Sequence, residues 1–115
     1  MHELALAQSL IETVNDLAIR EHFKKVISLT ISVGKLSGVD SDSLSFCLNE
    51  VVKNSILEQA KLYFEDVPIK IRCTSCKKES ILDEFLLDCP NCHSLEVSVI
   101  SGREFYIKDL EVEDV

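Results

Sequence analysis

The stretch VISLTISV, residues 26–33, decides the fold because apolar and small polar residues alternate along it. A period of two is typical of a β-strand with one buried face. Ile27, Leu29, Ile31 and Val33 are expected on one face, and the serines and threonine between them on the other. Glycines at positions 34 and 38 mark the exit from this strand.

Helical patterns lie on both sides of this strand. Residues 4–20 carry apolar side chains at helical spacing, as does a helix that packs on a sheet. A second helix is predicted from an N-cap in Ser41-Asp42-Ser43 to about Gln59. Histidine 22 follows the first helix, where a cation suits the C-terminal end of the helix dipole.

Four further segments have strand character. They are residues 61–65, 69–72, 95–100 and 103–112, and Pro68 interrupts the first two. The order of elements predicts an α/β fold in which two helices pack on a small, about three-stranded sheet, with an inserted cysteine module. We expect one domain from residues 1–70 together with 102–115, and a second from residues 71–101.

Length and charge narrow the class of protein. The chain has 115 residues, with 12 lysines and arginines against 20 acidic residues, so its net charge is −8. That charge argues against nucleic acid as the main partner, because phosphate binding needs clustered basic residues. No apolar stretch approaches the roughly 18 residues that span a bilayer, and the first residues do not resemble a signal peptide. A cytoplasmic protein without a membrane partner is predicted.

Four of the five cysteines form the pattern C-x2-C-x12-C-x2-C, with Cys73, Cys76, Cys89 and Cys92 as its members. Two thiolates spaced in this way hold one metal ion from a tight turn, and two such turns complete the tetrahedral set that zinc prefers. A closed set of four ligands leaves no position for substrate, so we interpret it as a structural zinc ribbon. A dithiol redox centre is the alternative, although it needs only one of the two pairs.

The residues around this motif have more ordinary interpretations. The intervening segment, which includes Ile81, Phe85 and Leu86, is apolar enough for a small hairpin. His93 directly follows the last cysteine and is either an exposed loop histidine or an accessory metal contact. Cys47 lies on the apolar stripe of the second predicted helix and is expected to be a small buried side chain.

The first residues offer a second kind of metal site. The α-amine of Met1, the backbone nitrogen of His2 and the imidazole Nδ1 of His2 can form fused five- and six-membered chelate rings. Such nitrogen sets suit Ni²⁺ and Cu²⁺, which tolerate square-planar geometry. Glu3 adds a carboxylate at the start of the predicted helix. Many proteins begin with Met-His, so these residues alone are a weak signal.

Together these features resemble the hydrogenase maturation factor family HypA/HybF. The resemblance rests on the Met1-His2-Glu3 start, the segment GKLSG at residues 34–38, the paired cysteines and the closing segment GREFYIKDLEV at residues 102–112. It spans essentially the whole chain in order. One departure is Lys78, which stands where some family members have a histidine after the first cysteine pair.

The resemblance implies a nickel metallochaperone with a structural zinc ribbon. His2 would bind nickel with the Met1 amine and Glu3 as neighbouring donors, and the four cysteines of the motif would bind zinc. The implied partners are the GTPase HypB and the large subunit of [NiFe]-hydrogenase, with the chain acting as a monomer or weak homodimer. A non-enzymatic role is therefore expected. A zinc-ribbon module for nucleic-acid or protein interaction is the alternative, followed by a thiol oxidoreductase.

Overall fold

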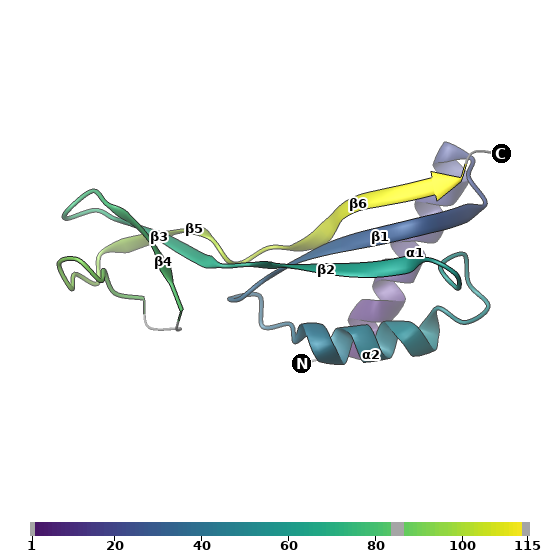
Figure 1. Ribbon diagram of the computed structural model, residues 1–115, viewed down its shortest axis with the longest axis horizontal. Helices are drawn as coiled ribbons and strands as arrows, with labels where there is room; N and C mark the ends of the chain where they lie inside the picture. Colours follow the sequence, from purple (N-terminus) through teal and green to yellow (C-terminus); the bar gives the residue numbers. More distant parts are fainter. Residues whose placement is uncertain (1, 84–86, 114–115) are drawn as a thin grey trace.

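The computed structural model describes residues 2–83 and 87–113, and it has the form of two lobes joined end to end (Figure 1). Its principal extents are 54 × 26 × 18 Å, and its radius of gyration is 17.5 Å. A compact domain of about 100 residues has a radius of gyration near 13 Å, so the chain is distinctly elongated. The larger lobe contains both helices, and the smaller lobe contains the four clustered cysteines.

Two helices and a three-stranded sheet form the larger lobe, as the sequence predicts. The helices are α1 (Glu3–Glu21) and α2 (Ser41–Val51). The strands are β1 (Lys25–Gly34), β2 (Lys61–Val67) and β6 (Phe105–Glu113), in the order β2-β1-β6. β1 and β2 are parallel and connected through α2, whereas β6 runs antiparallel to β1 on its other side. β1 is therefore the central strand on which the lobe is built.

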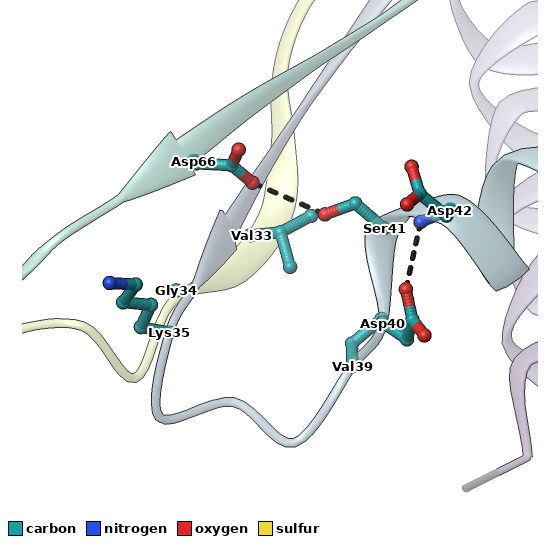
Figure 2. A pocket seen from close by; sticks show the side chains of 8 residues that line it. All are labelled: Val33, Gly34, Lys35, Val39, Asp40, Ser41, Asp42 and Asp66. Atoms are coloured by element: carbon teal, nitrogen blue, oxygen red, sulfur yellow. Dashed lines mark hydrogen bonds between the residues drawn. The ribbon is translucent and has the colours of Figure 1, made fainter. Parts of the chain in front are cut away.

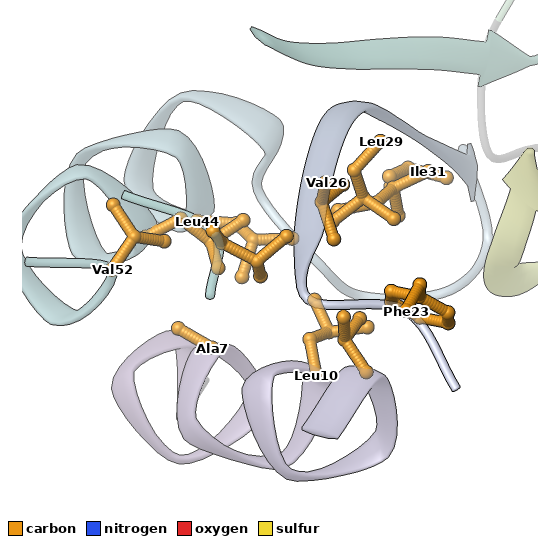
Figure 3. Packing of buried hydrophobic residues seen from close by; sticks show 12 residues of the cluster. Ala7, Leu10, Phe23, Val26, Leu29, Ile31, Leu44 and Val52 are labelled. Carbon is orange, nitrogen blue, oxygen red and sulfur yellow. The ribbon is translucent and has the colours of Figure 1, made fainter. Parts of the chain in front are cut away.

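The core of this lobe lies between the helices and one face of β1 (Figure 3). Leu29 and Ile31 on β1 are fully buried, as are Leu44 and Leu48 on α2. The predicted placement of Ile27 on the same face is wrong, because that side chain is 40% exposed and Val26 is buried instead. The register with β6 shifts between residues 26 and 28, and such a bulge reverses the alternation of side chains.

The second helix is shorter than predicted and begins one residue earlier. Its N-cap is Asp40, whose side chain accepts hydrogen bonds from the N–H groups of Asp42 and Ser43. The helix ends at Val51 instead of continuing to residue 59. Asn54 adopts a left-handed backbone conformation at φ 64°, and the hydroxyl of Ser55 donates to the carbonyl oxygen of residue 52 at 2.6 Å. A side-chain hydrogen bond of this kind replaces a hydrogen bond of the helix and so favours its end.

The smaller lobe has a sheet of its own, which was not predicted, although two of its strands correspond to the segments expected at residues 69–72 and 95–100. Its strands are β3 (Ile69–Cys73), β4 (Glu79–Leu82) and β5 (Val97–Ser101), all antiparallel neighbours in the order β4-β3-β5. Ile69 and Ile71 are fully buried within it. Of the expected apolar hairpin, Ile81 lies on β4, opposite Lys70 of β3, whereas Phe85 and Leu86 lie outside the described residues.

Backbone hydrogen bonds at the end of β1 and in the loop after it link the two segments that connect the lobes. The N–H groups of Gly34 and Leu36 donate to the carbonyl oxygens of Glu104 and Gly102, at 2.7 and 2.6 Å. The N–H of residue 35 donates to the carbonyl oxygen of Val67 at 3.0 Å. Both connections between the lobes are thus hydrogen-bonded to three consecutive residues, the last residue of β1 and the first two of the loop that follows it. Neither α1 nor α2, the helices of the described residues, is long and apolar enough to cross a membrane.

Candidate metal centres

The structure brings the four cysteines of the sequence motif together at the end of the smaller lobe. Their sulfur atoms all lie within 4.8 Å of one another. The Sγ atoms of Cys73 and Cys92 are 3.6 Å apart, and so are those of Cys76 and Cys89. Four sulfurs at about 2.3 Å from a tetrahedral zinc ion are about 3.8 Å from each other. The cluster therefore fits zinc with only small adjustments.

Each cysteine pair occupies a turn with the same backbone hydrogen bonds. In the first turn, the N–H of Cys73 donates to the carbonyl oxygen of Lys78, and the N–H of Lys77 donates to the carbonyl oxygen of Cys73. In the second turn, the N–H of Cys89 donates to the carbonyl oxygen of Ser94, and the N–H of His93 donates to the carbonyl oxygen of Cys89. The residue directly after the second cysteine of each turn, Lys77 or His93, has a left-handed backbone, with φ of 66° and 63° respectively. The two halves of the site are thus equivalent in backbone structure.

Contacts between the two turns hold them face to face. The hydroxyl of Ser75 lies 3.1 Å from that of Ser94. Both the N–H and the hydroxyl of Thr74 donate to the carbonyl oxygen of Glu96, at 2.9 and 2.8 Å. These supporting residues were not predicted from the sequence, because serine and threonine beside a metal motif form no distinct pattern.

The backbone N–H groups of the turns favour ionised thiols. The N–H of Lys78 lowers the pKa of Cys76 from its ordinary value of 9.0 to about 6. The N–H of Cys76 likewise lowers the pKa of Cys73. The N–H of Ser94 acts on Cys92 in the same direction, but the neighbouring thiols and desolvation outweigh it and raise the pKa of Cys92 to about 11. Full ionisation of the set therefore calls for a cation among the sulfurs.

Cys47 and His93 lie outside the cluster. Cys47 packs against the edge of the main core in the larger lobe and is half-buried, so the expectation of a small buried side chain is met in part. His93 supplies the backbone N–H that closes the second turn, and the residue itself is exposed. Its role as an accessory metal contact stays a prediction.

The first residues of the chain form the start of α1. His2 is the N-cap, and its carbonyl oxygen accepts a hydrogen bond from the N–H of Leu6 at 3.0 Å. Its imidazole makes no capping hydrogen bond, and the residue is exposed. Glu3 is the acidic residue of the first turn, and its Oε2 accepts from the N–H of Asp40 at 3.4 Å. Met1 lies outside the described residues.

The loop that leads to α2 borders a cavity of about 360 Å³ (Figure 2). The hydroxyl of Ser41 donates to Asp66 of β2 at 3.2 Å, and Asp40 accepts from the N–H of Asp42 at 3.0 Å. These contacts fix the start of α2 against the sheet. They also position the N–H group of Asp40, which donates to Glu3 in the first turn of α1. Asp40 was missed, although an aspartate directly before Ser41-Asp42-Ser43 is a common N-cap.

The fold and the four-sulfur cluster are those of a metal-binding protein, with a candidate metal site at one end. Comparisons with known proteins identify the family. The family model described as "Hydrogenase/urease nickel incorporation, metallochaperone, hypA" matches residues 1–112. The chain therefore belongs to the HypA family of metallochaperones, a class of metal-binding proteins and not of enzymes.

Individual relatives agree with this assignment over almost their full length. The chain is 37% identical to a hydrogenase maturation factor HypA of Aquifex aeolicus, over 98% of both chains. It is 35% identical to one of Campylobacter jejuni, over 96% of this chain and 97% of the relative. The solution structure of the nickel metallochaperone HypA from Helicobacter pylori has the same fold, with a TM-score of 0.68, 23% identity and 97% of each chain covered.

Proposed function

We propose that this chain binds Ni(II) at its N-terminus and delivers it to the large subunit of [NiFe]-hydrogenase during maturation. The GTPase HypB is the proposed partner, the cytoplasm the proposed compartment, and a monomer or weak homodimer the proposed state. Membership of a nickel-incorporation family supports this role, and so do the nitrogen donors of the first two residues.

The exposed imidazole of His2 is the observation that carries the nickel site. A helix N-cap residue commonly spends its side chain on capping, but that of His2 makes no such hydrogen bond. The imidazole is therefore available to a metal ion. The backbone nitrogen of His2 and the α-amine of Met1 would complete the two chelate rings. Glu3 is the neighbouring donor, and its carboxylate offsets the positive end of the α1 dipole.

Zinc is the proposed ion of the four-cysteine centre, where it has a structural role. All four positions of a tetrahedral ion would be taken by Cys73, Cys76, Cys89 and Cys92, and water or substrate would find no site. The division into a nickel-binding domain of residues 1–70 with 102–115 and a zinc-ribbon domain of residues 71–101 is part of this proposal. His93 is its accessory metal contact.

Nickel titration of the native, untagged protein tests this function. We expect one tightly bound nickel ion per chain in the wild type and its loss in His2→Ala. His22→Ala is the matched control, because His22 is an exposed histidine at the opposite end of the same helix. Equal nickel binding by His2→Ala and the wild type would show that the nickel site lies elsewhere.

A further inference from the structure

Two neighbouring cavities lie along the surface between the two helices of the larger lobe, and residues of both helices line each of them. One, of about 530 Å³, lies at the start of α1, and the other, of about 590 Å³, lies further along the helices. Gln8 of α1 borders both cavities. We call the surface of these two cavities the interhelical groove and define it by Leu4, Gln8, Ile11, Ser43, Cys47 and Val51.

Apolar side chains are accessible along this groove. Leu4 is 52% exposed, and Ile11, Cys47 and Val51 are half-buried. An exposed leucine and accessible apolar side chains beside a cavity are typical of a place where another protein docks.

The negative charge of the two helices indicates which kind of partner would bind in the groove. The acidic residues of α1 and α2 number six, against the single basic residue Arg20. They are Glu3, Glu12, Asp16, Glu21, Asp42 and Glu50. A second copy of this chain would bring the same negative surface, and nucleic acid or an anionic membrane would be repelled as well. A segment with lysine or arginine beside apolar side chains has the complementary charge, and an amphipathic helix fits a groove between two helices.

The groove also reaches the proposed nickel site, because His2 and Glu3 border its first cavity. We propose that the interhelical groove docks a basic, amphipathic segment of the protein that exchanges nickel with His2. This proposal rests on the nickel-handling function above and adds the surface at which the exchange takes place. A partner seated there has its own metal ligands within reach of the first residues of α1.

A pair of arginine substitutions on α1 tests the groove directly. Gln8→Arg places a positive charge in the middle of the groove, and Asn15→Arg makes a comparable change at an exposed position of the same helix outside it. With the purified HypB GTPase of the same organism as the probe, Gln8→Arg is expected to weaken binding at least tenfold. Asn15→Arg is expected to change binding less than twofold, and wild-type binding is expected to weaken as salt increases.

Three results would overturn the proposal. They are wild-type affinity in Gln8→Arg, an equal loss in both variants, and no binding of the wild type to the GTPase. A parallel nickel titration of each variant separates this proposal from the nickel function. If His2→Ala abolishes nickel binding while Gln8→Arg retains both nickel and full GTPase affinity, the groove is wrong and the nickel site stands. If His2→Ala binds nickel normally while Gln8→Arg loses the GTPase, the groove stands and the nickel site is wrong.

Discussion

Gly34 of β1 faces the carbonyl oxygen of Gly102 so closely that a Cβ at residue 34 would lie 2.1 Å from that oxygen. The two glycines meet where the chain crosses from one lobe to the other. Gly102 has a φ of 120°, which side chains rarely adopt, and a Cβ there would lie 3.1 Å from the Cα of Ile69. The junction of the lobes therefore depends on two positions that have no side chain.

Gly34→Ala is expected to destabilise this junction by about 1–3 kcal/mol, because the added methyl group forces the backbones apart. Denaturant unfolding measures the loss. Lys35→Ala is the control, since it removes only an exposed side chain whose Nζ donates to the carbonyl oxygen of Asp83 at 3.2 Å. An alanine at position 34 that unfolds like the wild type would show that the close approach can relax at little cost.

Ser32→Ala is expected to stabilise the protein by about 1 kcal/mol. Ser32 is fully buried in β1, and its hydroxyl has no hydrogen-bond partner among the residues that the structure describes. A buried hydroxyl without a partner costs free energy that alanine does not incur. Ser28→Ala, four residues earlier on the same strand, is the comparison, because the hydroxyl of Ser28 donates to Glu111 at 3.4 Å. Urea midpoints of both variants decide the matter, and a lower midpoint for Ser32→Ala contradicts the expectation.

Cys76→Ser is expected to abolish stoichiometric zinc and loosen the smaller lobe while most helical circular dichroism remains. The main core, which includes Leu29, Ile31 and Leu48, contains none of the four clustered cysteines. The larger lobe therefore has a hydrophobic core that does not depend on the metal. Cys47→Ser serves as the control and should retain its zinc. Global unfolding of Cys76→Ser would mean that the two lobes fold as one unit.

Zinc binding at pH 7 is expected to release fewer than four protons. The pKa of Cys76 is lowered to about 6 in the folded, metal-free ribbon, so its thiol is already ionised at pH 7. The pKa of Cys92 is raised to about 11, so that thiol must lose its proton when zinc binds. Acid therefore weakens zinc binding. Isothermal titrations in buffers of different ionisation heat count the protons, and a release of four would indicate a ribbon without these turns before zinc arrives.

Periodicity predicts the larger lobe well because its core is built from regular faces. The alternation of residues 26–33 and the helical stripe of residues 4–20 each correspond to an observed element. What the pattern misses is local. A bulge turns Ile27 outward, and Asn54 with Ser55 ends the second helix early. Both effects come from backbone geometry that does not change the sequence of apolar and polar residues.

The two candidate metal centres differ in how far the sequence predicts them. The spacing of the four cysteines predicts their cluster, because a metal with tetrahedral preference imposes the geometry. Strands were expected where β3 and β5 lie, but their pairing in a separate sheet was not, since β4 has only four residues and its pairing depends on the turns that the cysteines form. The proposed nickel site uses backbone groups and a single histidine. Its pattern is therefore weak, and only the resemblance to a family directs attention to it.

Nickel binding by a form extended with Gly-Ser before Met1 tests the central claim most directly. The extension removes the free α-amine next to His2 and one of the two chelate rings, and it leaves every side chain in place. We predict that the extended protein loses nickel affinity and the absorption of a square-planar site, while its zinc content and circular dichroism equal those of the native chain. An extended protein that binds nickel as the native chain does would show that the amine is not a ligand and would contradict this account of the site.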